Sequence, residues 1–298
     1  MKNASNTNTH LDFIVHGLGI ALSGRGRMPE ADNPQRPLII AIHGGTYSSR
    51  YFDVPGYSLL DRAHAEQLPI FAIDRPGYGQ SVDYASAAPS ITDNAEILES
   101  AIHEIWSNYK HQASGVVLIG HSIGGAICIA LAARQPSWPL LGIAVSGVGL
   151  DPVPESKDKW NEIPPTQTLV DIPPAAMNGF FFGPEGTYDS AVMPHASYEA
   201  AAPAPRSELI DISLGWPKLV NKLAAKVTVP VHYRQPQYEM LWPISTELVA
   251  QFARAFSNSP EVDAALLPGA GHCVDFHRVG EAFQREQLAF AKRCAQRV

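Results

Sequence analysis

The sequence is poor in cysteine and has no long apolar run. Its 298 residues include three cysteines, too few for the disulfide framework of a small secreted protein: Cys128, Cys273 and Cys294. We expect all three to be small apolar core residues. No stretch approaches the roughly 18 uninterrupted apolar residues of a membrane span, and the polar segment 1–10 has no apolar core like that of a secretory signal peptide. These absences predict a protein of the reducing cytoplasm.

Positive charge is also scarce. The chain has 22 Lys and Arg against 29 Asp and Glu, a formal net charge of −7, and no basic run. Nucleic acids are bound by clustered Lys and Arg, so a nucleic-acid partner is not expected. The histidines and cysteines lack the spacing of metal ligands, and the sequence has no phosphate-binding loop. We therefore expect no metal, no cofactor, and a small-molecule substrate as the partner.

The sequence does contain a regular alternation of apolar strands and amphipathic helices. Several strands are apolar along their whole length, as expected for strands covered on both faces. This order of strands and helices implies right-handed crossovers and an α/β fold, with a mostly parallel sheet and helices on both faces. After a hairpin over 12–23, the predicted strands are 37–43, 69–74, 115–119, 142–148, 227–234 and 262–267, and the predicted helices are 57–67, 92–109, 123–134, 245–256 and 279–295.

The alternation breaks between residues 151 and 217. This segment holds 11 of the 25 prolines, which argues against long regular elements. It is also more aromatic than a solvated linker, with Trp160, Phe180, Phe181, Phe182, Tyr188 and Trp216 among its residues. We interpret it as a lid inserted over the carboxyl edge of the sheet, with a satellite core under long loops as the alternative. Residues 1–150 and 218–298 then form one discontinuous core domain.

Residues 115–126, GVVLIGHSIGGA, place a serine at a sharp bend between a strand and a helix. This serine, Ser122, is the candidate nucleophile. Gly120 and Gly124 flank it, and a side chain at either position is expected to collide with the adjoining strand and helix. Functional residues of parallel sheets collect at the carboxyl ends of the strands, which is where the pattern places this serine.

A serine hydroxyl needs an adjacent base, and a histidine in a loop after the last strand meets that need. His272 follows the glycine-rich turn 268–271, which is flexible enough to aim its ring. Its place in the predicted topology makes it the favoured base. Five other histidines compete for the role: His43, His121, His195, His232 and His277.

The base in turn needs a carboxylate to hold its ring. The chain order serine, carboxylate, histidine restricts this acid to residues between 122 and 272. Glu239 follows the strand that is predicted to end near Arg234, and it is the favoured acid. Asp151 follows the predicted strand 142–148 and is the rival, because a carboxylate there can also reach such a histidine.

The order and spacing of these motifs resemble the α/β-hydrolase superfamily over nearly the whole chain outside 151–217. Residues 120–124 (GHSIG) resemble its nucleophile elbow, 269–272 (GAGH) its histidine turn, and 74–81 (DRPGYGQS) its structural loop. The segment 229–239 is similar to the stretch that usually presents an aspartate, so Glu239 is a departure from the pattern. The resemblance implies the α/β-hydrolase fold.

The oxyanion formed by attack on a carbonyl needs preorganised N–H donors. The N–H of Ile123 is one candidate, because it follows the nucleophile at the start of a helix. His43-Gly44-Gly45 resembles the oxyanion turn of the superfamily, and the resemblance assigns the second donor to the N–H of Gly45. Thr46 is an alternative, through its N–H or its hydroxyl.

Together these residues predict a serine hydrolase that cleaves an ester-like bond of a small or medium, apolar substrate through an acyl-enzyme. Serine at the bend argues against epoxide hydrolase and haloalkane dehalogenase activity, for which the superfamily uses aspartate. Two alternatives stay open. One is cleavage of a lactone, an amide or a carbon–carbon bond, and the other is a ligand-binding protein with little turnover.

Overall fold

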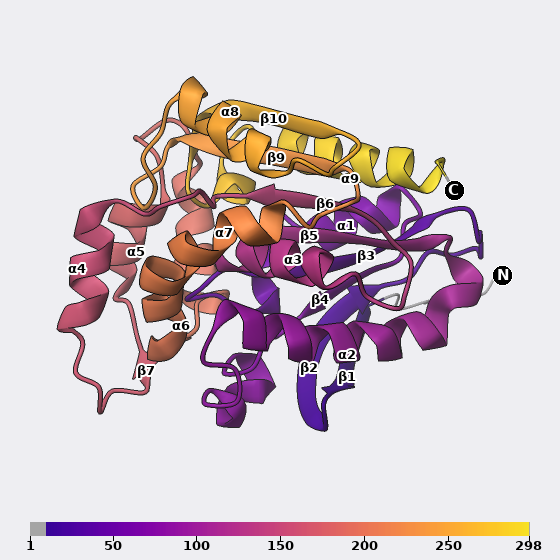
Figure 1. The fold of residues 1–298 in the computed structure, drawn as a ribbon, viewed down its shortest axis with the longest axis horizontal. Coiled ribbons are helices and arrows are strands. Elements are labelled where there is room, and N and C mark those ends of the chain that lie inside the picture. The colour runs from indigo at the N-terminus through magenta and orange to yellow at the C-terminus, as the bar shows by residue number, and fades with distance from the viewer. Residues whose placement is uncertain (1–9, 298) are drawn as a thin grey trace, which may run out of the picture.

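The computed structural model describes residues 10–297, and its centre is an eight-stranded sheet (Figure 1). The polar segment 1–9 and the side chain of Trp160 lie outside the described part of the chain. The second strand runs antiparallel to both of its neighbours, and the other pairs are parallel. In spatial order the strands are β1 (His10–Gly17), β2 (Ile20–Arg27), β4 (Ile70–Ile73), β3 (Pro37–Ile42), β5 (Gly115–His121), β6 (Leu140–Ser146), β9 (Val231–Tyr238) and β10 (Val262–Gly271).

Helices cover both faces of the sheet (Figure 1). One face carries α1 (Leu59–Ala65) and α9 (Gly280–Ala295), and the other carries α2 (Ile91–Tyr109), α3 (Ile123–Arg134), α7 (Trp216–Ala224) and α8 (Thr246–Ala255). Successive strand residues point to opposite faces, so Ile40 of β3 joins the core under α2 and α3, and Ile39 joins the core under α1 and α9. The predicted mostly parallel sheet with helices on both faces is confirmed.

Strand β9 differs from the predicted range 227–234, because it begins later and extends to Tyr238. Its pairing with β6 stops at Arg234, whereas its pairing with β10 continues through Pro236, opposite Leu267, and after an irregularity reaches Tyr238, opposite Gly271. Proline has no N–H to donate, so it fits the part of the strand that has lost one neighbour. Glu239 therefore follows the strand directly instead of lying in a turn after it.

Residues 151–217, called the cap segment from here on, lie beyond one end of the sheet (Figure 1). Prolines occupy the first turns of its two longest α-helices, where a missing N–H removes no intrahelical hydrogen bond. All its elements are short, as the proline content predicts. They include α4 (Pro154–Glu162), α5 (Pro174–Phe181), α6 (Arg206–Ile210) and a ribbon of β7 (Leu169–Val170) and β8 (Ala204–Pro205).

The buried side chains of the cap segment belong to the two cores of the sheet. Phe181 and Phe182 join the core under α1 and α9, whereas Leu209 and Ile212 join the core under α2 and α3. The cap segment is therefore continuous with the main cores, unlike a satellite core under long loops.

The three cysteines are buried and free. Burial raises the pKa of each thiol, which keeps it protonated and unreactive at neutral pH. This environment agrees with the expected role of small apolar core residues. Within residues 10–297, the structure contains no helix that is both long enough and apolar enough to cross a membrane.

Candidate active site

Ser122 occupies the bend between β5 and α3 in a strained backbone conformation. Its φ of 55° and ψ of −123° lie outside the regions that residues with side chains normally adopt, and such strain costs about 1–3 kcal/mol. Two backbone hydrogen bonds hold the bend: the N–H of Ser122 donates to Ser146, and the N–H of Gly125 donates to Ser122, each at 2.8 Å. The bend presents the serine at the carboxyl edge of the sheet.

The two glycines that flank Ser122 leave no room for a side chain. A Cβ on Gly120 would lie 2.5 Å from the carbonyl oxygen of Gly124, and a Cβ on Gly124 would lie 2.0 Å from the carbonyl oxygen of Ile42. Both separations are far inside van der Waals contact. The start of α3 can approach β3 and β5 this closely only because both positions are glycine, as the sequence predicts.

His272 and Glu239 are in direct contact. Nδ1 of His272 lies 2.6 Å from Oε2 of Glu239, and both side chains are almost completely buried. The other carboxylate oxygen, Oε1, accepts the N–H groups of Met240 and Leu241, each at 2.9 Å. The backbone that follows β9 thus orients the carboxylate, and the hydrogen bond to the carboxylate occupies Nδ1 of the imidazole. This leaves Nε2 as the nitrogen that can face a reacting group.

Asp151, the rival acid, lies elsewhere. Its side chain is 59% exposed, and its Oδ1 pairs with Nζ of Lys157 at 2.6 Å. An exposed carboxylate with a lysine partner has no means of orienting a buried imidazole. Of the two carboxylates that the sequence leaves open, the structure brings Glu239 to His272 and places Asp151 at the surface.

Two of the competing histidines lie near Ser122 but are held by other neighbours. The ring of His121 stacks on Tyr51 with the centroids 4.6 Å apart and the planes 4° from parallel. The ring of His43 lies between two backbone groups, because Nδ1 donates to the carbonyl of Gly44 at 2.8 Å and Nε2 accepts the N–H of Arg75 at 3.2 Å. Both rings are part of the packing behind the site.

His277 ties the histidine turn to the cap segment. Its Nε2 accepts the N–H of Gly271 at 2.9 Å and the N–H of Gly183 at 3.0 Å, and its Nδ1 donates to the carbonyl of Cys273 at 2.9 Å. The cap also binds the turn directly, since the carbonyl of Phe181 accepts the N–H of Cys273 at 2.9 Å. Another competitor, His195, pairs within the cap with Glu199.

The residues that carry the predicted oxyanion donors, Gly45 and Ile123, lie close to each other, and the turn approaches Ser122. A Cβ on Gly45 would be 2.9 Å from Cδ1 of Ile123, and a Cβ on Gly44 would be 2.9 Å from Cβ of Ser122. Ile123 is the first residue of α3, so its N–H is among those that a helix leaves unpaired at its start. The hydroxyl of Thr46 donates to the carbonyl of Gly45 at 2.6 Å, which engages it within the turn.

One cavity contacts all of these groups. Ser122, His272, Gly45, Thr46 and Ile123 line it, and its volume is about 50 Å³. A water-sized group needs about 10–15 Å³ of such volume, so the space next to the serine accepts only a few heavy atoms. The remaining wall is mostly apolar and includes Ile172, Phe181, Leu209, Ile212, Leu241 and Trp242. For the four of these positions that lie in the cap segment, the sequence gives no signal beyond its apolar character, and for Leu241 and Trp242 it gives none.

A larger, mostly apolar cavity of about 620 Å³ adjoins the first one. The two cavities share Ile172, Phe181 and Leu241, which therefore form the wall between them. Met240 lines the larger cavity and is 53% exposed, so this cavity reaches the surface. The larger cavity is thus open to solvent and is separated from Ser122 by this wall.

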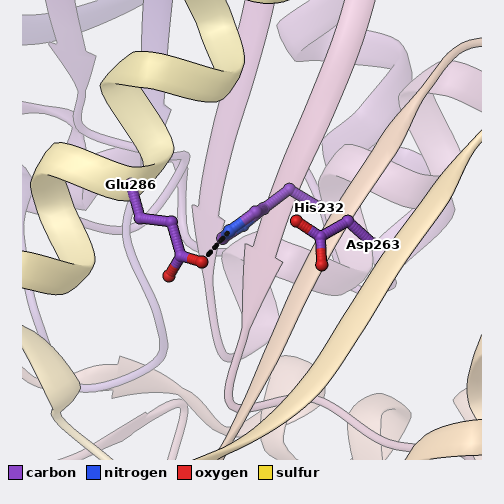
Figure 2. A group of neighbouring side chains, drawn as sticks. All are labelled: His232, Asp263 and Glu286. Carbon is purple, nitrogen blue, oxygen red and sulfur yellow. Dashed lines mark ion pairs between the residues drawn. The ribbon is translucent and has the colours of Figure 1, made fainter.

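Three possible metal ligands, His232, Asp263 and Glu286, lie together (Figure 2). His232 and Asp263 pair near the beginning of β9 and β10, at the opposite end of these strands from the carboxyl edge. The guanidinium of Arg234 already binds both carboxylates. Nη1 and Nη2 lie 3.0 and 3.1 Å from the Asp263 oxygens, and Nη2 also pairs with Glu286. The proximity of His232 and Arg234 lowers the pKa of Glu286 to about 2. A metal cation would have to displace the guanidinium, so these residues form an ion-pair network.

Three features together are typical of the α/β-hydrolase class. They are a mostly parallel sheet, a strained serine at a strand-to-helix bend and a buried histidine–glutamate pair. The sequence pattern of the alpha/beta hydrolase family matches residues 39–284, and the chain belongs to this family. Ser122, His272 and Glu239 all lie within the matched range.

Solved structures of esterases share the fold over nearly the whole chain. A thermophilic esterase from Thermogutta terrifontis has a TM-score of 0.68 and 19% identity, and the match covers 95% of this chain and 99% of that one. A thermostable carboxyl esterase from Bacillus coagulans has a TM-score of 0.72 and 14% identity, over 97% of this chain and 100% of that one.

A curated relative is similar over a shorter region. Protein phosphatase methylesterase 1 of Candida albicans is 29% identical over 106 residues, which are 36% of this chain. The match spans only 27% of the relative's own length.

Proposed function

We propose that the protein is a serine hydrolase of carboxylic esters, with Ser122 as nucleophile, His272 as general base and Glu239 as the acid that orients the base. The observation that carries the proposal is the cavity in which Ser122 and His272 both lie, with Nδ1 of His272 held 2.6 Å from Glu239. The esterase structures with this fold support the reaction class. The partial match to a methylesterase also supports an ester substrate.

In the proposed reaction, Oγ of Ser122 attacks the ester carbonyl carbon and passes its proton to Nε2 of His272. The N–H groups of Gly45 and Ile123 bind the oxyanion. His272 then gives the proton to the departing alcohol, which leaves an acyl group on the serine. Water attacks this acyl-enzyme after losing a proton to the same imidazole. As the second intermediate collapses, His272 returns this proton to Oγ of Ser122, which releases the carboxylic acid and restores the serine.

The sizes of the two cavities favour a short, apolar acyl group. The space of about 50 Å³ next to Ser122 takes only a few heavy atoms. The cavity of about 620 Å³ beyond Ile172, Phe181 and Leu241 takes a larger group. We assign the acyl side to the inner cavity and the alcohol side to the outer one.

A fluorophosphonate probe tests the nucleophile. We expect the wild-type protein to be labelled at Ser122 and the Ser122→Ala variant to lose labelling. Ser213→Ala is the matched control, because Ser213 lines the same cavity and its hydroxyl donates to the carbonyl of Leu209 at 2.9 Å. No labelling of the wild type, or equal labelling of Ser122→Ala, would show that Ser122 is not an activated nucleophile.

Turnover of p-nitrophenyl esters tests the bond and the acyl length. We expect kcat/KM to be highest for acetyl and propionyl esters and to fall as the acyl chain lengthens. Faster turnover of a lactone or amide series would reassign the bond. Labelling without turnover of any of these compounds would favour the ligand-binding alternative.

The buried, free cysteines support the reducing cytoplasm as the proposed location.

A further inference from the structure

A buried ion pair joins the cap segment to the oxyanion turn, residues 43–45. Arg75 follows β4, Glu208 belongs to cap helix α6, and both side chains are almost fully buried. The guanidinium binds both carboxylate oxygens of Glu208, through Nη1 to Oε2 and through Nη2 to Oε1. Tyr78 donates its hydroxyl to the same carboxylate at 2.5 Å. The cap segment therefore supplies the counter-ion of an arginine that belongs to the core.

The same guanidinium binds the oxyanion turn. Its Nε donates to the carbonyl of His43 at 3.1 Å, and its Nη2 donates to the carbonyl of Gly44 at 3.0 Å. Nδ1 of His43 donates to the same Gly44 carbonyl at 2.8 Å. Burial and then the charge of Arg75 lower the pKa of His43 well below its ordinary range, so the ring stays neutral. Two donors thus fix the Gly44 carbonyl.

Fixing this carbonyl also fixes the N–H of Gly45. The two groups belong to one planar trans peptide, in which the C=O and the N–H point in opposite directions. Gly45 has no side chain that could hold the peptide, and a Cβ there would lie 2.9 Å from Cδ1 of Ile123. The direction of this proposed oxyanion donor is therefore set from behind, by Arg75 and His43.

Arg75 depends on Glu208 for its place. A buried charge without a partner is strongly destabilising, so the guanidinium needs a carboxylate within contact. Among the contacts of Arg75, Glu208 supplies the carboxylate, whereas Asn94 offers a neutral amide oxygen at 3.4 Å from Nη1. Without the charge of Glu208, the guanidinium lowers its free energy by moving toward water, and this movement takes it away from the Gly44 carbonyl.

The backbone of the cap segment makes a second, independent contact just after the turn. The N–H of Ala202 donates to the carbonyl of Thr46 at 2.9 Å, and the N–H of Ser48 donates to the carbonyl of Ala200 at 3.1 Å. The cap segment thus borders the oxyanion turn on two sides, with its main chain beyond the turn and the Glu208 carboxylate behind it.

We propose that Glu208 is a positioning residue for the oxyanion hole, acting through Arg75 on the peptide between Gly44 and Gly45. The inference rests on the proposed ester hydrolysis and deepens it. It makes the cap segment part of the apparatus that stabilises the oxyanion, in addition to a wall of the cavity. Loss of the Glu208 charge is expected to impair the transition state more than substrate binding.

Kinetics of Glu208→Gln on a short-chain activated ester test the proposal. We expect kcat to fall by about 10-fold to 100-fold, which is less than the roughly 100-fold to 1,000-fold that complete loss of an oxyanion donor costs. KM is expected to stay within about threefold, because the interaction acts on the transition state. The inhibition constant of a trifluoromethyl ketone, whose adduct with serine carries an oxyanion, should rise by the same factor as kcat falls.

The matched control is Asp211→Ala. Asp211 also joins the cap to the core, since its Oδ2 accepts the N–H of Ile91 at 2.7 Å. Among the described residues, its side chain makes no hydrogen bond to the oxyanion turn. A general loosening of the cap would lower kcat in both variants. The proposal requires a large loss in Glu208→Gln and a loss below about threefold in Asp211→Ala; equal losses would overturn it.

A second variant covers the case in which Glu208→Gln does not fold. Replacing both members of the pair, Arg75→Met with Glu208→Leu, leaves no unpaired charge, and such apolar replacements are often tolerated. At a Tm close to that of the wild type, we still expect the loss in kcat, because the Gly44 carbonyl has lost its arginine donor. Wild-type kcat in this variant would overturn the proposal.

An assay without turnover separates this inference from the proposed function. The protein has 23 glycines, and labelling with ¹⁵N-glycine allows their amide resonances to be followed by NMR. The Gly45 amide resonance should shift or broaden in the double variant and stay in place in Asp211→Ala. An unchanged Gly45 resonance in the double variant would refute the inference even if the wild type hydrolyses no ester. Ester hydrolysis by the wild type with unchanged kcat in the double variant would refute it while leaving the proposed function intact.

Discussion

His121 precedes the candidate nucleophile, and its ring carries two nitrogens without a hydrogen-bond partner among the described residues. Burial, then the neighbouring His272 and His43, lower its pKa well below the ordinary value. The folded protein therefore keeps this ring neutral at a pH where the unfolded chain takes up a proton. The unfolded state binds more protons in that range, so this histidine makes folding stability fall as the pH falls through about 6.5.

For a ring that stays neutral in the folded protein, the size of the effect follows from the unfolded pKa alone. For an unfolded pKa of about 6.5, protonation stabilises the unfolded state by about 1.4 kcal/mol at pH 5.5 and by less than about 0.1 kcal/mol at pH 7.5. Replacing His121 by a residue that does not titrate should remove this difference. For a chain of this length, the difference corresponds to about 2 °C in Tm.

Urea unfolding at pH 7.5 and pH 5.5 measures the effect in the wild type, His121→Phe and His121→Asn. The two variants differ in volume and packing, so their absolute stabilities will differ. Both should nevertheless lose about 1.4 kcal/mol less than the wild type between the two pH values. If the wild type and both variants lose the same stability on acidification, His121 does not become protonated on unfolding and the reasoning is refuted.

Three further predictions concern the site. Glu239→Gln should lower kcat/KM on an activated ester by about three to four orders of magnitude, whereas Asp151→Asn should leave it within about twofold; the opposite ranking would make Asp151 the acid. Gly124→Ala should destabilise the protein by about 3 kcal/mol or more in urea unfolding, and Gly125→Ala by clearly less, because its Cβ would meet its nearest atom at 3.2 Å. Met240→Trp should raise KM by about 10-fold for esters of bulky alcohols and leave KM for methyl esters unchanged, and equal KM changes for both would argue against the outer cavity as the alcohol side.

The strand, bend and helix around Ser122 were predictable because their signals are local. An apolar run, the two glycines that flank Ser122 and the start of an apolar helix lie within 12 consecutive residues, 115–126. Glu239 and His272 could be named because the chain order of such sites restricts the choice. Their roles in catalysis stay predictions that the variants above test, although the structure does bring their side chains together.

The parts that could not be predicted depend on contacts between distant residues. Arg75 and Glu208 are 133 positions apart, and nothing in the local sequence of either residue indicates the other. The predicted range of strand β9 begins too early because the run from Val227 to Val229 has high strand propensity, whereas pairing with β10 decides the actual range. The inner cavity was equally hidden, since its walls come from short elements whose order reflects packing and not periodicity.

Hydrogen bonds of its backbone join the cap segment to the core at two places. Phe181 and Gly183 make them at the histidine turn, and Ala202 makes one next to the oxyanion turn. Swinging it open as a flap would break all of these hydrogen bonds together, each worth about 0.5–1.5 kcal/mol. Amide hydrogens in these contacts should therefore exchange with solvent more slowly than amides of exposed loops. For the proposed hydrolase, we therefore expect access to Ser122 to depend on the side-chain rotamers of Ile172, Phe181 and Leu241, the wall between the two cavities.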